Sequence, residues 1–165
     1  MLIEYFIENW RNIDKKDIDF TENEWKDISG HEHLEEEFIE KYKNKVNWPR
    51  ISEYQKLSES FIEKYQNKVD WYWISSNQEL SESFIEKYQN KVDWSHISMH
   101  QKLSEEFMEK YQNKVNWYCV SERQNISDIF ILRHYENIDH YYLKYNKNIQ
   151  YKLYESKLGR NLLVL

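Results

Sequence analysis

Two histidines, which would lie next to each other on one face of a helix, are the residues that most resemble a metal site. His96 and His100 stand at i and i+4, a spacing that can ligate zinc, and Cys119 lies one 23-residue step beyond His96. No H-E-x-x-H motif and no second cysteine accompany them. We therefore predict two ordinary interface histidines and no metal ion.

Groups able to perform covalent or acid–base catalysis are present, but not in a catalytic arrangement. The single cysteine, Cys119, lacks a recognisable nucleophile motif. Most aspartates and glutamates recur in every repeat, which suits salt bridges and solubility better than one acid–base pair in a distinctive environment. Gly30 and Gly159 are the only glycines, so there is no glycine-rich phosphate loop. We expect a protein that is not an enzyme and uses no cofactor.

These residues belong to a 23-residue unit that is copied along the chain. Self-similarity at a fixed period predicts a repeat architecture, in which each unit packs on its neighbours. The recurring aromatic residues are Trp25, Trp48, Trp71, Trp94 and Trp117, then Phe38, Phe61, Phe84 and Phe107, and finally Tyr42, Tyr65, Tyr88 and Tyr111.

Each copy reads as two helices. Ser58 is a good N-cap, and apolar residues at every fourth position up to Val69 predict a first helix of about eleven residues. Asp70 can cap a second, shorter helix that runs to about Gln78. Such a hairpin cannot bury its own large aromatic residues, so neighbouring copies must stack. We predict an all-α fold, an α-solenoid of stacked αα-hairpin repeats with degenerate terminal caps.

The chain is expected to form a single repeat domain, because two glycines and one proline leave no visible linker. Within 1–165 we assign 1–24 to an N-terminal cap, 25–125 to regular repeats, and 126–165 to a degenerate repeat and C-terminal cap. We expect the apolar tail 162–165 to dock on the last helix. The degenerate repeat keeps Ile126, Phe130, Ile138 and Leu143 in register, places His140 in the tryptophan slot, and continues with Ile149 and Leu153.

Charge and hydropathy restrict the partners. The net charge is −6 with acidic and basic residues interleaved, so no broad surface for nucleic acid is expected. No apolar run approaches the roughly 20 residues of a membrane span, and the N-terminal residues do not read as a secretory signal. The lone cysteine excludes an internal disulfide and fits a reducing compartment. We expect a cytoplasmic protein with no membrane partner.

The copies differ at a small set of positions, which we call the variable slots. Leu57–Glu79 and Leu80–Lys102 differ at five of 23 positions, and the same five differ in the other neighbouring comparisons. Four slots lie on the second helix, on the face opposite a constant set of Trp, Ile or Val, Ser and Gln. They hold Pro49, Arg50, Glu53 and Tyr54, then Tyr72, Trp73, Ser76 and Asn77, then Ser95, His96, Met99 and His100, then Tyr118, Cys119, Glu122 and Arg123. The fifth slot follows the helix and holds Lys56, Glu79, Lys102 and Asn125.

Drift of unrestrained surface residues is the simple explanation of this variation. Two observations favour a binding face instead. Glu63, Asn67 and Lys68 on the outer face of the first helix are unchanged across four copies, although drift should affect both faces. The variable slots also hold Trp, Tyr, Met and His, which are typical of interfaces. The predicted partner-binding residues are Arg50, Glu53, Tyr54, Tyr72, Trp73, Asn77, His96, Met99, His100, Tyr118, Glu122 and Arg123.

We expect a non-catalytic scaffold that binds a macromolecule, most readily a protein. Three other functions stay open. In one, the aromatic residues Tyr54, Tyr72, Trp73 and Tyr118 form a pocket that sequesters a nucleotide-like small molecule. In another, the protein is a self-associating structural repeat, and its oligomeric state is open. In the third, an acidic surface imitates nucleic acid, although the interleaved lysines work against a continuous anionic track.

The unit F-I-E-K-Y-Q-N-K-V-D-W-x-x-I-S-x-x-Q-x-L-S-E, which spans roughly Trp25 to Gln124, resembles short tandem repeats in uncharacterised proteins of giant DNA viruses and bacteriophages. The resemblance implies a virus- or phage-linked helical repeat protein with no assigned catalysis, working in the host cytoplasm. Binding and inhibiting a host defence effector is the purpose that it suggests. It supplies no functional residues, and the terminal segments depart from the pattern.

Overall fold

Helices make up the regular secondary structure of this chain. The computed structural model describes residues 3–13, 18–31 and 33–147, and these contain twelve helices and no strand. The expected all-α fold of stacked helical repeats is confirmed. The contacts divide the chain into two compact units, which we call the N-terminal unit (Met1–Gln78) and the C-terminal unit (Glu79–Leu165). A single repeat domain over the whole chain stays a prediction.

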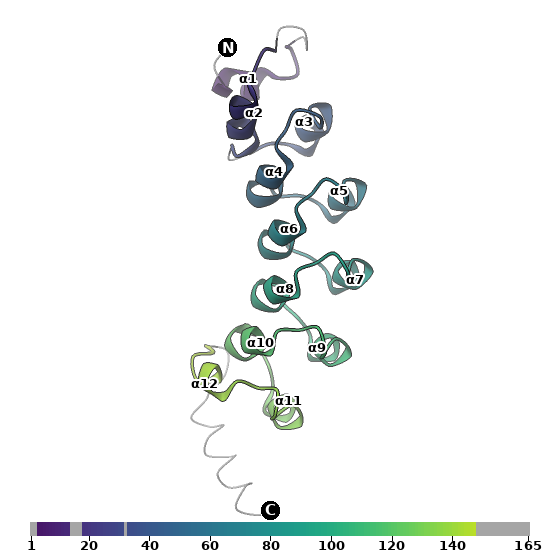
Figure 1. Cartoon of the computed structure of the whole chain (residues 1–165), viewed down its shortest axis with the longest axis vertical. Coiled ribbons are helices and arrows are strands. Elements are labelled where there is room, and N and C mark those ends of the chain that lie inside the picture. Colours follow the sequence, from purple (N-terminus) through teal and green to yellow (C-terminus); the bar gives the residue numbers. More distant parts are fainter. Residues whose placement is uncertain (1–2, 14–17, 32, 148–165) are drawn as a thin grey trace, which may run out of the picture. The chain divides into compact units, whose positions relative to one another are not determined.

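The N-terminal unit has two layers of helices (Figure 1). Helices α2, α4 and α6 form one layer, in which α2 packs on α4 and α4 packs on α6, while α1 packs on α2. Helices α3 and α5 form the other layer. The helices are α1 (Ile3–Asn9), α2 (Glu22–Ser29), α3 (Glu36–Lys41), α4 (Trp48–Tyr54), α5 (Glu59–Lys64) and α6 (Trp71–Asn77).

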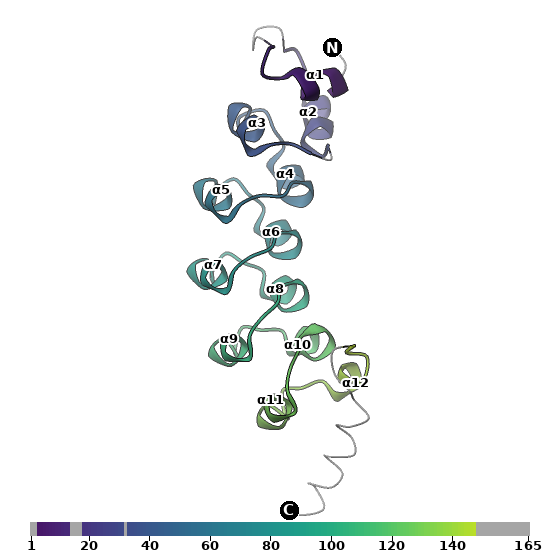
Figure 2. The same cartoon turned by 180° about the vertical axis from the view of Figure 1, so that it is seen from behind.

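The C-terminal unit repeats the same two-layer plan, which Figure 2 shows from behind. Helices α8, α10 and α12 form one layer, with α10 packed against both α8 and α12. Helices α7, α9 and α11 form the second layer. The helices are α7 (Glu82–Lys87), α8 (Trp94–His100), α9 (Glu105–Lys110), α10 (Trp117–Arg123), α11 (Asp128–Arg133) and α12 (His140–Leu143).

The helices begin where the sequence predicts. Ser58 Oγ accepts the backbone N–H of Phe61 at 3.2 Å, and Asp70 Oδ1 accepts that of Tyr72 at 3.0 Å. Both side chains satisfy first-turn donors that have no partner within the helix. Pro49 stands in the first turn of α4, where its missing N–H costs no hydrogen bond.

The first helix of each repeat is shorter than expected, and the prediction of about eleven residues was wrong. Helix α5 has six residues, because Tyr65 leaves the α-helical region with φ −112° and ψ 26°. The chain then turns, and the N–H of Val69 donates to Tyr65 O at 3.1 Å. The indole Nε1 of Trp71 donates to Gln66 O at 3.0 Å and so satisfies a carbonyl of this turn. The four-residue apolar spacing continues through the turn, which keeps Val69 buried.

Aromatic residues from three elements fill the space between layers. In the C-terminal unit the ring of Trp94 on α8 lies 6.2 Å from Phe107 and 5.1 Å from Tyr111, centroid to centroid. Phe107 and Tyr111 are 4.7 Å apart. Because such rings bury roughly 150–250 Å² each, packing between consecutive repeats supplies much of the hydrophobic stabilisation.

The described ends of the chain adapt the same packing. Phe6 of α1 is fully buried, and its ring lies 5.7 Å from that of Phe38. At the other end His140 occupies the tryptophan slot, and its Nε2 lies 3.2 Å from Tyr135 O, repeating the indole contact of the regular repeats. The in-register residues Ile126, Phe130, Ile138 and Leu143 are all buried. The predictions for Ile149, Leu153 and the tail Leu162–Leu165 lie outside the described residues.

Candidate partner-binding surface

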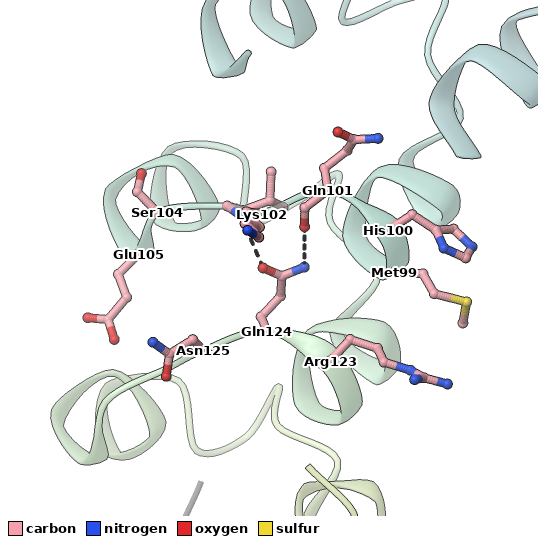
Figure 3. Close-up of a pocket in the computed structure, with 10 residues that line it drawn as sticks. Met99, His100, Gln101, Lys102, Ser104, Glu105, Arg123, Gln124 and Asn125 are labelled. Carbon is pink, nitrogen blue, oxygen red and sulfur yellow. Dashed lines mark hydrogen bonds between the residues drawn. The ribbon is translucent and has the colours of Figure 1, made fainter. Parts of the chain in front are cut away.

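A constant glutamine joins neighbouring repeats within each unit. Gln124 accepts the backbone N–H of Leu103 on Oε1 at 3.1 Å. Its Nε2 donates to Ser98 O at 2.7 Å and to Gln101 O at 2.8 Å, and Figure 3 shows the bonds to Leu103 and Gln101. The side chain is buried, so these three backbone groups depend on it. Gln78 and Gln55 make the corresponding bonds in the N-terminal unit.

A constant serine couples consecutive second helices. Ser98 Oγ donates to Trp94 O at 2.7 Å and accepts the backbone N–H of Asn116 at 2.9 Å. Asn116 is itself the N-cap of α10, so one hydroxyl links the interior of α8 to the start of the next helix. The serines Ser29, Ser52 and Ser121 hold their following repeats in the same way.

Charged residues tie the first helices together. Lys110 Nζ pairs with Glu86 Oε1 at 2.6 Å, and the backbone N–H of Ser104 donates to Glu82 Oε1 at 2.5 Å. The hydrogen bond from Lys110 holds the pKa of the Glu86 carboxyl below its usual value. The Glu40–Lys64 pair in the N-terminal unit has the same geometry, with a separation of 2.5 Å.

These contacts change how the constant outer residues are interpreted. Lys68 Nζ donates to Lys43 O at 3.2 Å and lies 5.6 Å from the centre of the Trp48 ring in the preceding repeat. The slot of Glu63 is occupied in other copies by Glu40 and Glu86, which form the ion pairs just described. The constancy of this face therefore has a structural reason. It does not count as evidence that the variable slots bind a partner.

The variable slots of α4 and α6 lie partly in solvent. Tyr54 is 47% exposed, and the Arg50 guanidinium lies 5.2 Å from the centre of its ring. The Arg50 side chain also passes close to Gly30, 3.5 Å from where a Cβ would stand. Glu53 is half-buried, and its carbonyl accepts Asn77 Nδ2 at 2.8 Å. The predicted residues of these two helices are thus joined by direct contacts.

Tyr72 and Trp73 form an aromatic pair on α6. Their rings meet edge to face, with centroids 4.9 Å apart and planes at 88°. Tyr72 is 48% exposed, whereas Trp73 is half-buried. The pair presents a large, partly desolvated aromatic surface, and the contact between the two rings fixes their relative orientation.

The two histidines of α8 lie together, as their spacing predicts. Their ring centroids are 5.8 Å apart and nearly parallel at 18°, and His96 Nδ1 lies 3.0 Å from Asp93 Oδ1. Burial and the nearby His96 and Arg123 lower the pKa of His100, which favours its neutral form. Met99, which lies between the two histidines in the sequence, is half-buried. Among the described residues no three His, Cys, Asp or Glu side chains form a group that could hold a metal ion.

Cys119 does not belong to an exposed surface, contrary to the expectation that the four helical slots face solvent. Its side chain is buried against the stack. Burial, and then the Glu122 carboxylate, raise the pKa of the thiol, so it is less reactive than an exposed cysteine. The neighbouring slots do reach solvent, since Tyr118 and Arg123 are exposed and Arg123 Nε lies 3.5 Å from Glu122 Oε2.

Tyrosines of α12 extend the variable slots of α10, and the sequence interpretation omitted them. The ring of Tyr118 lies 4.1 Å from that of Tyr142, and a hydrogen bond between them raises the pKa of Tyr118. Tyr141 and Tyr145 are both more than half exposed, with Lys144 Nζ 4.0 Å from the centre of the Tyr141 ring. Tyr141 and Tyr142 of α12, and Tyr145 just after it, occupy variable slots of the degenerate repeat. Extending the slot comparison by one repeat would have found them.

A second apolar surface lies on α11 and the turn that follows it. Ile129 is 68% exposed, and Leu132 and Tyr135 are also exposed. In the three preceding repeats the same slots are polar, with Ser or Glu, then Glu, then Gln. The sequence comparison could have found this change, but it was restricted to the regular repeats.

Lys102 and Asn125, two residues of the fifth variable slot that were left out of the predicted site, line a groove in the C-terminal unit (Figure 3). This space of about 800 Å³, which we call the loop groove, lies between the segment from the end of α8 to the start of α9 and the end of α10. Met99, His100 and Arg123 point to one side of the buried Gln124. The groove is lined by Met99, His100, Gln101, Lys102, Leu103, Ser104, Glu105, Arg123, Gln124 and Asn125.

Fold and surface together define a helical repeat protein with a constant frame and a variable exposed chemistry. No family model, curated protein or solved structure matches the chain. The resemblance to viral tandem repeats therefore stays a prediction. In the part of the chain that the structure describes, every helix is too short or too polar to cross a membrane.

Proposed function

We propose that this protein is a non-catalytic scaffold that binds another protein through the variable slots of its second helices. The observation that carries the proposal is the exposure of large aromatic residues on a frame that does not need them. Tyr54, Tyr72 and Tyr118 are 47%, 48% and 38% exposed, whereas the constant Ile and Ser residues on the opposite face are fully buried.

Interface energetics support a protein partner. Binding energy is concentrated in aromatic and arginine side chains, which fill pockets and lose their remaining water on association. The variable slots offer such residues at Arg50, Tyr72, Trp73 and Arg123. Because each is held by contacts with its own repeat, less conformational entropy is lost on binding.

A nucleotide sponge fits the geometry less well. A flat base needs aromatic faces that are open for stacking. Tyr72 and Trp73 instead meet edge to face, and Tyr118 packs on Tyr142. Titrating the tryptophan fluorescence with nucleotides tests this alternative, and a flat response removes it.

Replacing Tyr72, Trp73, His96 and Met99 together with alanine tests the scaffold proposal. We expect the helical circular dichroism to persist and capture of a cross-linked protein partner from lysate to be lost, because the exposed aromatic contacts are removed. A matched control replaces Ser60 and Ser83, which are exposed on the first helices, with alanine. If folding and capture both survive the fourfold replacement, the proposal is wrong.

Self-association is a second candidate, favoured by the apolar surface of α11. Ile129, Leu132 and Tyr135 are exposed at positions that are polar in every inner repeat. Such patches mark association surfaces in soluble proteins. Sedimentation at several concentrations, with Ile129→Ser, Leu132→Glu and Tyr135→Gln as the comparison variant, separates the candidates. A concentration-independent monomer in both proteins excludes self-association.

The resemblance to viral and phage repeats supports a narrower version of the proposal, in which the partner is a host defence effector. Its test is an activity assay in host cells. Restoration of phage growth by the intact chain, and not by the fourfold alanine variant, is the expected result. Equal growth with both proteins contradicts this version alone.

A further inference from the structure

The loop groove combines a constant frame with variable chemistry. Five of its ten lining residues occupy constant slots and are held in place, notably Gln124 by three backbone bonds and Glu105 by the backbone N–H of Ser127 at 2.5 Å. The other five occupy variable slots and are Met99, His100, Lys102, Arg123 and Asn125. A groove that combines fixed constant residues with replaceable ones is suited to recognition.

Cations outnumber carboxylates among the residues that line the groove. Lys102 and Arg123 supply two cations, with Arg123 Nε 3.5 Å from the Glu122 carboxylate, and Glu105 supplies the one carboxylate of the lining. That carboxylate already accepts the N–H of Ser127 and, at 3.2 Å, its hydroxyl. The lowered pKa of His100 favours its neutral form, and Met99 adds a polarizable apolar side chain.

The corresponding slots of the N-terminal unit differ in charge and contact. Glu53 and Tyr54 stand where the groove has Met99 and His100, and Asn77 stands in the slot of Arg123. Asn77 donates across to Glu53 O at 2.8 Å, which joins the two helices directly. Lys56 stands in the slot of Lys102, so the cation that distinguishes the groove of the C-terminal unit is Arg123.

We propose that the loop groove binds an extended acidic segment of the partner protein, with carboxylates facing Lys102 and Arg123 and an apolar side chain against Met99. This inference rests on the proposed function and specifies the chemistry of its partner. The volume of about 800 Å³ accommodates a few side chains of such a segment. Complementary charge gives the contact its selectivity.

A nucleic acid fits the same groove less well. A phosphate backbone needs a continuous cationic track, and each contact it makes is sequence-independent. Here two cations share the groove with Glu105, and the chain carries a net charge of −6, which repels a long polyanion. A short acidic peptide brings few charges and experiences less of this repulsion.

Fluorescence anisotropy with labelled octapeptides tests the proposal on the full chain. The probe alternates glutamate and leucine, and its comparison peptides alternate glutamine or lysine with leucine. The variant Lys102→Glu with Arg123→Asn uses residues that the repeat Leu57–Glu79 carries in those slots, Glu79 and Asn77, so the frame tolerates them. Lys26→Glu with Lys43→Asn gives the same change in net charge at exposed positions outside the groove.

We expect the glutamate peptide to bind, and we expect its affinity to fall at least tenfold in the groove variant and to stay unchanged in the control variant. Raising the salt from roughly 50 to 500 mM should also lower this affinity by about tenfold or more. Equal binding of the glutamine or lysine peptide overturns the proposal. So does unchanged affinity in the groove variant, or no binding at about 1 mM peptide.

Two further readouts separate this inference from the proposed function. A labelled oligothymidylate that binds more tightly than the acidic peptide, with the same sensitivity to Lys102→Glu and Arg123→Asn, assigns the groove to nucleic acid and overturns the peptide. If the fourfold alanine variant loses partner capture while the groove variant keeps it fully, the scaffold function stands and the groove inference fails.

Discussion

The two faces of helix α8 differ in burial and in how much their residues vary between repeats. Ile97 and Ser98 on one face are fully buried, and Ser98 bonds to backbone in its own helix and in the next. Ser95 and His100 on the other face are exposed, and their slots change from copy to copy. The contrast teaches that backbone-directed bonds from a few constant side chains hold the repeats together. The exposed chemistry can therefore change without loss of the fold.

The constant glutamine gives the largest expected effect. Gln124→Ala leaves the N–H of Leu103 and the carbonyls of Ser98 and Gln101 without their partner in a buried site. We expect a loss of about 2–5 kcal/mol in the free energy of unfolding, measured with urea. Gln112→Ala, at an exposed position, is the control and should change it by less than about 0.5 kcal/mol. Equal losses for the two variants would mean that the buried bonds of Gln124 do not hold neighbouring repeats together.

A pair of serines on α8 compares the two faces directly. Ser98→Ala removes the acceptor for the N–H of Asn116 and should cost about 1–2 kcal/mol in unfolding free energy. Ser95→Ala removes an exposed hydroxyl, 3.2 Å from Asn116 Nδ2, and should stay within about 0.5 kcal/mol. Denaturant unfolding of the two variants measures both. A larger loss for Ser95→Ala would reverse the assignment of the faces.

The ion pairs of the first helices predict a smaller, pH-dependent effect. Hydrogen bonds from Lys64 and Lys110 lower the pKa of Glu40 and Glu86 in the folded chain. Their contribution to stability is thus complete above the unfolded pKa near 4.5 and is lost as the pH falls through the lower folded pKa. Unfolding measured from neutral to acid pH should show a shallower acid decline for Glu40→Gln with Glu86→Gln. An unchanged decline would mean that these pairs contribute nothing to the frame.

Local signals in the sequence were sufficient for much of the fold. The caps Ser58 and Asp70 act within three residues, so their hydrogen bonds could be predicted from spacing alone. The length of the first helix could not, because the apolar spacing continues through the turn after Tyr65. Periodicity reports which residues are buried and not where the α-helical hydrogen bonds stop.

Contacts between repeats limited the prediction of the site. Gln78 was recognised as constant, but its bonds reach Ser52 and Gln55, more than twenty residues back. The same kind of contact explains the constancy of Lys68, which the sequence comparison had used as an argument against drift on the variable face. Lys102 and Asn125 were identified as variable but left out of the site, since they follow the helix. The turn of the chain places them in the loop groove.

Copying the variable slots of α8 onto α6 tests the central claim most directly. Apart from these four slots the two copies differ only at Glu79 and Lys102, so Tyr72→Ser, Trp73→His, Ser76→Met and Asn77→His change the variable slots of the helix and leave every constant slot in place. We predict a Tm within about 4 °C of the parent and a loss of partner capture of about tenfold or more. A folded variant that captures its partner as well as the parent, or a variant that no longer folds, would contradict the account.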